Sequence, residues 1–325
     1  MRDGVNPEKY KGEKNKCYFH RIIIPVYIPN NQEEYYSNSI EVLDACLNSL
    51  IQTINFETTA ITLINNNSSE FLIQPIMVKY KAYIDKFVIY GENKGKVYPV
   101  FSEAKAAYEP FITIADADLL FFSGWESAVF EIFKDIKKAG VVSPLPLQSL
   151  ALNKNNSVFF DNYFFGRIKY DKIVSDNDND LYLKGLFNPA LFNRRNRTFS
   201  WKEKQYYLKN NVTAVLGAGH FCATYRKAIF NFETEFPEMK FINGYEDIYL
   251  DEPADRNGWY RLSTAKSYAY HIGNKIDDFV LKANFDNELL LNSKIFKNIK
   301  NPSKSIVPYR IKIIFFKIIK KLMKL

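Results

Sequence analysis

The chain has 325 residues, of which 47% are hydrophobic and 25% charged, and its formal net charge is +8. This composition is typical of globular proteins and excludes low-complexity and collagen-like classes, and the length suits one large domain or two small ones. The three cysteines, Cys17, Cys46 and Cys222, show no CxxC spacing, so we expect a reducing compartment. No uncharged stretch reaches the roughly 18 residues of a membrane span, and the first residues lack the apolar run of a secretory signal.

The positive charge is concentrated at the C-terminal end of the chain. No acidic residue follows Glu288, whereas ten basic residues do. Without these ten, the chain has 34 basic and 36 acidic residues, so the body of the protein is close to neutral. A nucleic-acid-binding domain would have a basic face on its folded part, and we therefore predict no nucleic-acid partner.

Apolar runs and helical periodicity alternate over the first 146 residues. Runs rich in β-branched residues predict strands over 20–29, 58–64, 87–93, 110–118 and 141–146. Apolar residues at helical spacing predict helices over 37–53, 76–87, 96–109 and 124–140, the first opened by a capping box of Asn38 and Glu41. Alternating strands and helices favour βαβ units, hence an α/β fold with a mainly parallel sheet and helices on both faces.

The pattern becomes irregular between 145 and 210. Here "SDNDND" (175–180) predicts a solvated loop, and "NRRNR" (193–197) forms a short basic cluster. We interpret this stretch as an insertion or a mobile loop. The basic cluster is either a phosphate contact or simply solvated. Regular patterns return over 213–230, 244–262 and 265–275.

The sequence "RIKIIFFKIIKKLMKL" (310–325) is amphipathic if it is helical. One face would hold Ile311, Phe315, Ile318, Leu322 and Leu325, and the other Arg310, Lys317, Lys321 and Lys324. Lys312 fits neither face. Helices that are apolar on one side and basic on the other lie at anionic membrane surfaces. The alternative is an ordinary packing or oligomer-forming helix.

Two aspartates follow the predicted strand "FITIA". Asp116 and Asp118 are two residues apart, so their side chains point the same way if the strand continues. Carboxylates are preferred ligands of Mg²⁺ and Mn²⁺, which often bind through one or two of them plus substrate phosphates. The alternative is a turn or helix cap built from aspartates. The position after a buried strand favours a cation site.

A second acidic pair, Glu246 and Asp247, lies in "GYEDIYLDEP". Acidic residues in the first turn of a helix are common because they suit its dipole. The functional alternative is a general base at the rim of a pocket.

Two of the three histidines are candidate site residues. His271 follows a strand-like run and precedes a glycine, and a neutral imidazole there could be a further metal ligand. His220 follows Gly217 and Gly219, which indicate close approach of the backbone to another group. His20 begins the first strand, and we assign it no role.

Taken in order, eight stretches resemble the inverting nucleotide-sugar glycosyltransferases of family 2, which have the GT-A fold. The resemblance extends over residues 20 to 275. Its stretches are "IIIPVYIPN", "LDACLNSLIQT", "LINNNSS", "GENKGK", "ITIADADLLF", "GAGHFCATYRKAIF", "GYEDIYLDEPADRNGWYRL" and "HIGN".

The resemblance implies a role for each matching residue. The residues expected at the nucleotide and donor sugar are Pro25, Val26, Tyr27, Asn66, Asn67, Asn93, Lys94, Asp116, Ala117, Gly219 and His220. Asn66 and Asn67 stand where the family usually has an aspartate, so the base is left open. Asp118 would bind the metal directly, with His271 completing its shell and Asp116 reaching the ribose or a metal-bound water. Asp247 would be the catalytic base, with Glu246 beside it.

The resemblance and the charge pattern together predict an organisation and an activity. The resemblance implies a GT-A domain over 19–290, and composition makes residues 1–18 a polar extension and 291–325 a basic, membrane-associating tail. Within the domain, 19–145 would bind the nucleotide and 146–290, with an insertion over 146–210, the acceptor. The enzyme would use Mn²⁺ or Mg²⁺ to transfer sugar from a UDP- or GDP-type donor to a glycan or lipid-linked acceptor, as in capsule or lipooligosaccharide synthesis. It would lie in the cytoplasm on the inner face of the membrane.

Two other functions compete with this one. A sugar nucleotidyltransferase would have a Gly- and Arg-rich loop after the first strand, where this chain reads "PVYIPNNQEEYY". A non-catalytic nucleotide-sugar or glycan-binding module would not need the acidic residues and His271 that this chain carries.

Overall fold

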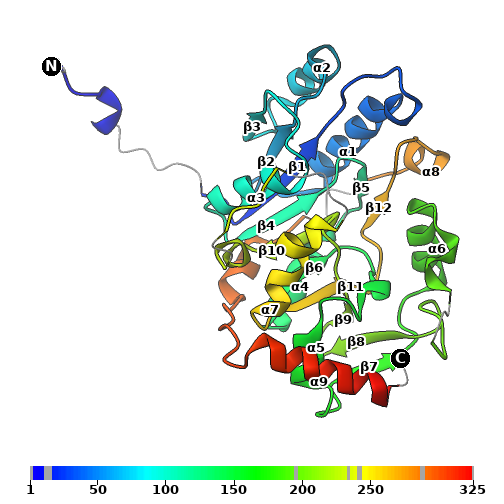
Figure 1. Ribbon diagram of the computed structural model, residues 1–325. Helices are drawn as coiled ribbons and strands as arrows, with labels where there is room; N and C mark the ends of the chain where they lie inside the picture. The colour runs from blue at the N-terminus through cyan, green and yellow to red at the C-terminus, as the bar shows by residue number, and fades with distance from the viewer. Residues whose placement is uncertain are drawn as a thin grey trace.

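A computed structural model of the chain describes residues 3–10, 17–193, 197–232, 235–239, 244–285 and 290–323. A twisted ten-stranded sheet passes through it in the order β3-β2-β1-β4-β10-β6-β11-β9-β8-β7, and a two-stranded sheet pairs β12 with β5 (Figure 1). The strands are β1 (His20–Val26), β2 (Thr59–Asn65), β3 (Lys86–Ile89), β4 (Phe111–Ala115), β5 (Leu119–Phe121), β6 (Ala139–Ser143), β7 (Ile168–Asp171), β8 (Gln205–Lys209), β9 (Thr213–Leu216), β10 (Cys222–Arg226), β11 (Tyr260–Thr264) and β12 (Ala269–His271).

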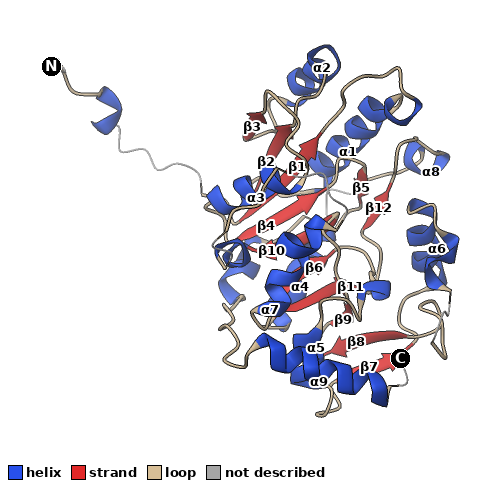
Figure 2. Cartoon of the chain, viewed as in Figure 1, coloured by secondary structure: helices blue, strands red, loops and turns tan. Residues whose placement is uncertain are grey.

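Helices cover both faces of the large sheet (Figure 2). They are α1 (Ser39–Thr53), α2 (Glu70–Tyr80), α3 (Val97–Ala106), α4 (Trp125–Asp135), α5 (Asn156–Asn162), α6 (Asp176–Gly185), α7 (Glu252–Arg256), α8 (Asp278–Leu281) and α9 (Tyr309–Leu322). Alternate residues of β1 enter two different cores, since Ile22 and Ile24 pack with α1, α2 and α4 while Ile23 packs with α3 and α7. This alternation is what a strand buried on both faces requires, and it confirms the expected α/β class.

The sheet is parallel where the sequence shows its βαβ pattern. The strands β3, β2, β1 and β4 pair in parallel, so their carboxyl ends lie along one edge. β10 then runs antiparallel between β4 and β6, with Cys222 opposite Ala115. The residues just before β10 therefore lie at the same edge as the residues just after β4.

Two local predictions about helix starts are wrong. The helix expected over 76–87 spans Glu70–Tyr80, because Ile73, Ile76 and Tyr80 are buried at helical spacing and the helix continues through Pro75. The capping box is not formed either. Asn38 precedes α1, but its side chain makes no cap bond and donates instead to the Ser37 hydroxyl, at 3.1 Å.

The irregular stretch 145–210 contains regular structure. It provides α5 and α6 and adds the antiparallel strands β7 and β8 to the sheet, so the mobile loop that we expected is wrong. "SDNDND" forms the start of α6: the Ser175 hydroxyl accepts from the Asp178 N–H at 3.1 Å, and the acids lie in the first turn, where they suit the dipole. Polar composition cannot distinguish such a helix start from a loop.

The basic cluster at 193–197 is described only in part. Arg194 and Arg195 lie outside the described residues. Arg197 packs its guanidinium over the Trp201 ring, 3.2 Å from the centroid, and donates to the Phe199 carbonyl and the Tyr170 hydroxyl.

His20, to which we assigned no role, lies in a fully buried polar network. Its Nδ1 lies 2.8 Å from Glu126 Oε1 and its Nε2 lies 2.6 Å from the Thr113 hydroxyl. Glu126 also accepts from the Thr59 hydroxyl at 2.6 Å and from the Asn55 N–H at 3.0 Å. This carboxylate joins α4 to β1 and β2.

We expect Glu126→Ala to lower the free energy of unfolding by about 3–5 kcal/mol, because the substitution leaves several buried polar groups without their hydrogen-bond partner. Denaturant unfolding measures the change. Glu131→Ala is the matched control on the same helix, because Glu131 is half-exposed and pairs with Lys134 at the surface. It should cost less than about 0.5 kcal/mol. Equal losses in the two variants would contradict the structural role of the network.

Candidate active site

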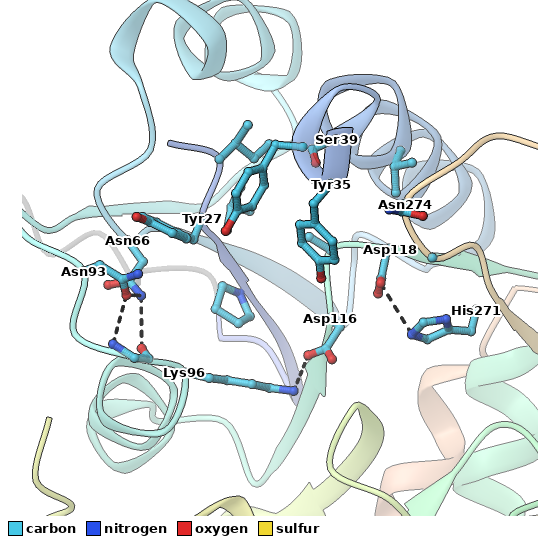
Figure 3. Close-up of a pocket in the computed structure, with 18 of the residues that line it drawn as sticks. Tyr27, Tyr35, Ser39, Asn66, Asn93, Lys96, Asp116, Asp118, His271 and Asn274 are labelled. Carbon is cyan, nitrogen blue, oxygen red and sulfur yellow. Dashed lines mark hydrogen bonds and ion pairs between the residues drawn. The ribbon is translucent and has the colours of Figure 1, made fainter. Parts of the chain in front are cut away.

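A cavity of about 540 Å³ opens at the carboxyl ends of the parallel strands (Figure 3). Its walls come from the segment after β1, the turns after β2 and β3, the end of β4 and the segment around β12. Ligands of open α/β sheets bind outside the carboxyl ends of the strands, where neighbouring connections diverge. The fold therefore gathers residues from distant parts of the chain around one hollow.

Aromatic side chains line part of this cavity. Pro25, Val26 and Tyr27 line it as the sequence predicts, and Tyr35 and Tyr36 join them from a single 3-10 turn, Glu34–Tyr36. The rings of Tyr27 and Tyr36 lie edge to face with their centroids 6.2 Å apart. Planar rings with a polar tip suit contact with a flat, polar heterocycle such as a nucleobase. Sequence reasoning missed the two tyrosines because their segment looks like a polar loop.

The asparagines divide into two groups. Asn66 and Asn93 line the cavity, whereas Asn67 and Lys94 do not. The Asn66 amide donates to Asn93 Oδ1 at 2.8 Å and to the Gly95 carbonyl at 3.0 Å, and it accepts from the Lys94 N–H at 3.0 Å. Asn67 adopts the left-handed backbone region, with φ of 70°, and the Lys94 ammonium lies 2.7 Å from Glu92. The side chain of Asn66 therefore holds the turn that carries Asn93.

We expect Asn66→Ala to weaken nucleotide binding about five- to tenfold, because it leaves the Lys94 N–H and the Gly95 carbonyl without partners and loosens that turn. Calorimetry with UDP and GDP measures the loss. Asn67→Gly is the matched control, since it is the next residue and glycine tolerates the left-handed backbone. If Asn66→Ala binds like the unmodified chain, the turn does not position the nucleotide.

Two carboxylates and an imidazole also line the cavity (Figure 3). Asp116 is ion-paired with Lys96, a cavity residue that the sequence analysis did not single out. The Asp118 Oδ2 atom lies 3.4 Å from His271 Nε2, and its Oδ1 atom is buried without a hydrogen-bond partner among the described residues. Burial raises the pKa of Asp118, and the neighbouring Asp116 adds to this while His271 opposes it.

The small two-stranded sheet brings this group together. In β12, His271 is the register partner of Leu119 in β5, and the Ile272 N–H donates to the Asp118 carbonyl at 2.7 Å. The His271 Nδ1 atom lies 3.1 Å from the Gly185 carbonyl, at the end of α6. Because a carbonyl can only accept, Nδ1 carries a hydrogen, and in the neutral imidazole Nε2 then presents a lone pair to Asp118.

This donor set fits a hard divalent cation. With the imidazole neutral, two acceptors, His271 Nε2 and Asp118 Oδ2, face each other, and among the described residues no donor reaches the buried Oδ1 atom. Carboxylate oxygens with one imidazole suit Mn²⁺ or Mg²⁺. A cation bound between Asp118 and His271 would replace the repulsion between their lone pairs with attraction to the metal.

A second polar group lies outside this cavity. Asp247 and Asp251 belong to a π-helical turn, Asp247–Asp251. One imidazole nitrogen of His220 and one carboxylate oxygen from each of Asp247 and Asp251 lie within 4.8 Å of one another, close enough to hold a metal ion. Asp251 accepts from His220 Nδ1 at 2.8 Å and from the fully buried Arg261 at 2.7 Å. Because Arg261 already balances this charge, we interpret the group as an acid–base network.

The two aspartates of this network differ in acidity. Burial raises the pKa of Asp247, and the carboxylate of Asp251 raises it further. Burial alone would also raise the pKa of Asp251, but Arg261 and His220 hold it below its ordinary value. Asp251 therefore stays ionised, and Asp247 is the carboxylate of the pair that holds a proton more readily.

Backbone pairing places this network beside the cavity. The Asp116 N–H donates to the Phe221 carbonyl at 2.8 Å, one residue after His220. Asp247, Glu246, Gly219 and His220 do not line the cavity itself.

The glycines near His220 approach the protein's own backbone. Gly217 has φ of 119°, and a Cβ atom there would lie 2.2 Å from the Leu147 carbonyl. The Gly219 N–H donates to the Ser143 hydroxyl at 3.2 Å. The close approach that these glycines indicated is therefore explained by packing inside the chain.

Solved structures of similar shape exist, but each similarity is low. S. aureus TarS residues 1–349 is 14% identical with a TM-score of 0.46, covering 77% of this chain and 59% of that chain. A second TarS structure, in complex with UDP-GlcNAc, is 13% identical with a TM-score of 0.45, covering 82% and 61%. The mannosyltransferase PcManGT from Pyrobaculum calidifontis, in complex with GDP-Man and Mn²⁺, is 10% identical with a TM-score of 0.43, covering 77% and 55%.

This chain therefore covers less than two thirds of the chain in each of those three structures. No curated protein matches it. The model of the family described as glycosyl transferase family 2 matches residues 22–231, which is more than half of the chain. The resemblance inferred from the sequence is thus confirmed, and the chain belongs to glycosyl transferase family 2.

Proposed function

We propose that this protein is a metal-dependent, inverting glycosyltransferase that moves a sugar from a nucleoside diphosphate sugar to an acceptor hydroxyl. The observation that carries the proposal is the order of groups along one cavity. Tyr27, Asn66 and Asn93 lie on one side of it and Asp118 and His271 on the other, with Tyr35 and Asp116 between them (Figure 3). Family membership supports the same reaction class.

The donor, of UDP or GDP type, would bind along this cavity. Its base would contact Tyr27, Tyr35 and Asn93, and its diphosphate would extend toward Asp118. The residues that would hold Mn²⁺ or Mg²⁺ are Asp118 and His271, with Asp116 nearby. A bound cation of this kind stabilises the negative charge that develops on a leaving diphosphate. Lys96, at 22% exposure, is a further cation of the protein beside Asp116.

The acceptor would be activated by Asp247. As the acceptor oxygen attacks the anomeric carbon, its proton moves to the Asp247 carboxylate, and the bond from that carbon to the diphosphate oxygen breaks. Attack opposite the leaving group inverts the anomeric centre. The raised pKa of Asp247 makes it a stronger base than an ordinary aspartate. Glu246 lies next to it in the chain, half-buried.

The finer features of the proposal concern acceptor and location. The acceptor would be a surface glycan or its lipid-linked precursor, of the capsule or lipooligosaccharide kind. The enzyme would act in the cytoplasm at the inner face of the membrane, attached through residues 291–325, with no nucleic-acid partner. Support comes from the acid-free, basic tail. No helix among the described residues has the length and apolar character needed to cross a bilayer.

A nucleotide-release assay tests the proposed reaction class. The full chain would be incubated with UDP-GlcNAc or GDP-mannose, together with Mn²⁺, Mg²⁺ or a chelator. We expect slow donor hydrolysis that releases UDP or GDP only when the cation is present. Donor binding without release under any condition would instead favour a non-catalytic binding module on the same fold.

A further inference from the structure

The exposed side of α9 and the turn after α5 form one apolar surface, which we call the α5–α9 patch. On α9, Ile311, Ile314, Ile318 and Leu322 are all exposed, Ile314 by 60%. In the turn after α5, Phe164 and Phe165 are exposed by 61% and 73%. Contiguous apolar surface of this kind is uncommon on the water-exposed surface of a protein and marks an interaction site.

The docking of α9 on the domain explains why this side is exposed. The helix packs through Lys312, Phe316 and Ile319, which are buried. The Lys312 ammonium donates to the Ser157 hydroxyl at 3.0 Å, and the ring of Phe316 lies 4.7 Å from that of Phe159. The helix therefore uses a narrow stripe that includes a lysine for its own packing. Most of the predicted apolar face, Ile311, Ile318 and Leu322, remains exposed.

Phe315 connects the two parts of the patch. Its ring lies 4.9 Å from Phe160 and 5.1 Å from Phe164, centroid to centroid. In Figure 1, α9 lies next to α5 along one end of the molecule. Two segments about 150 residues apart in the sequence thus present one continuous surface.

Basic residues surround the patch. Arg310, Lys317 and Lys321 are exposed on α9, and the Arg167 guanidinium lies over the Phe165 ring, 5.4 Å from its centroid. The one acidic residue of α5, Asp161, is already paired with Lys138 at 2.6 Å. An apolar centre with a cationic rim is complementary to an anionic bilayer and not to a neutral one.

We propose that the α5–α9 patch is a membrane-binding face that inserts Phe164 and Phe165 together with the exposed apolar residues of α9 into an anionic lipid surface. The new element is the phenylalanine turn, which lies far from the tail in sequence. The inference extends the membrane contact of the proposed function, but binding to lipid needs neither the donor nor sugar transfer.

Vesicle cosedimentation with the full chain tests the proposal. We expect binding to vesicles of equal parts phosphatidylcholine and phosphatidylglycerol, weakened by salt, and little binding to phosphatidylcholine alone. Phe164→Ser/Phe165→Ser should weaken binding on the order of tenfold, because both inserted rings are lost. Phe71→Ser is the matched control: Phe71 is 85% exposed on α2, away from the patch, and binding should not change. Circular dichroism would verify that each variant folds.

Three outcomes would overturn the proposal. If Ile314→Ser/Ile318→Ser abolishes binding while the phenylalanine variant binds normally, the tail acts alone. If all lipid binding is absent, the surface has another purpose. If sedimentation shows a dimer that the same substitutions dissociate, the patch is an interface between copies. Asp247→Asn should bind vesicles normally, so a failure of the catalytic proposal is distinguishable from a failure of this one.

Discussion

Asp247→Asn is expected to abolish sugar transfer while leaving donor binding nearly unchanged. An amide cannot accept the acceptor's proton, and removal of a general base typically costs about 10²- to 10⁴-fold in rate. Asp247 does not line the donor cavity, so the nucleotide and cation contacts should survive. Transfer rates and calorimetric donor affinity, measured on the same preparation, test the two halves of this prediction.

Glu246→Gln is the matched control, because it removes the neighbouring carboxylate of the same turn. It should retain most of the activity if Asp247 alone takes the proton. Loss of donor binding in Asp247→Asn would show that this residue belongs to the donor site and would remove the base assignment. Equal loss of transfer in both variants would show that Glu246 and Asp247 act together in accepting the proton.

The pH dependence of transfer should reflect the same residue. Asp247 must be ionised to accept a proton, and its pKa is raised by burial and by Asp251. The rate should therefore fall as the pH drops through this raised pKa, at a higher pH than an ordinary aspartate would show. A pH–rate profile of kcat measures the position of the acidic limb. A limb at the ordinary aspartate value would mean that another group carries the proton.

The second large effect is expected at the cation site. Asp118→Ala should remove most of the gain in donor affinity that Mn²⁺ or Mg²⁺ provides, on the order of tenfold or more. The variant loses both oxygens that face His271 and the cavity, including the buried Oδ1 atom. Calorimetric titration of UDP and GDP, with and without the cation, measures the difference.

Asp176→Ala is the control for this prediction. Asp176 is exposed in the first turn of α6 and pairs with Lys172 at 2.8 Å, so the cation effect should be unchanged. If a chelator leaves donor binding and transfer of the unmodified chain intact, Asp118 does not act through a metal. Asp116 and Lys96 would then be the charged groups nearest the diphosphate.

The sequence by itself determined the α/β class and one end of the site. Buried strands followed by periodic helices leave a strong local signal, because alternation and helical spacing are properties of neighbouring residues. Asp116 and Asp118 directly follow such a strand, so the edge of the sheet that they occupy could be predicted. Pro25 lies at the end of the first strand and Tyr27 directly follows it, and the structure places both at the same cavity.

Polar composition does not predict local structure reliably where local and tertiary effects compete. "SDNDND" looked like a solvated loop, yet the hydroxyl of Ser175 caps a helix there. Lys312 fitted neither face of the tail, because its ammonium has a buried partner, Ser157, that is distant in sequence. A lysine in a packing stripe cannot be anticipated without knowing what it packs against.

Only the tertiary structure decided which distant groups meet. Pairing of β5 with β12 brings His271 to Asp118, and folding of the 3-10 turn brings Tyr35 to the cavity. Arg261 pairs with Asp251, while burial and the Asp251 carboxylate raise the pKa of Asp247. The contact of His271 with Asp118 joins residues far apart in the chain, and it depends on strand order and register, which a periodic pattern of neighbouring residues does not specify.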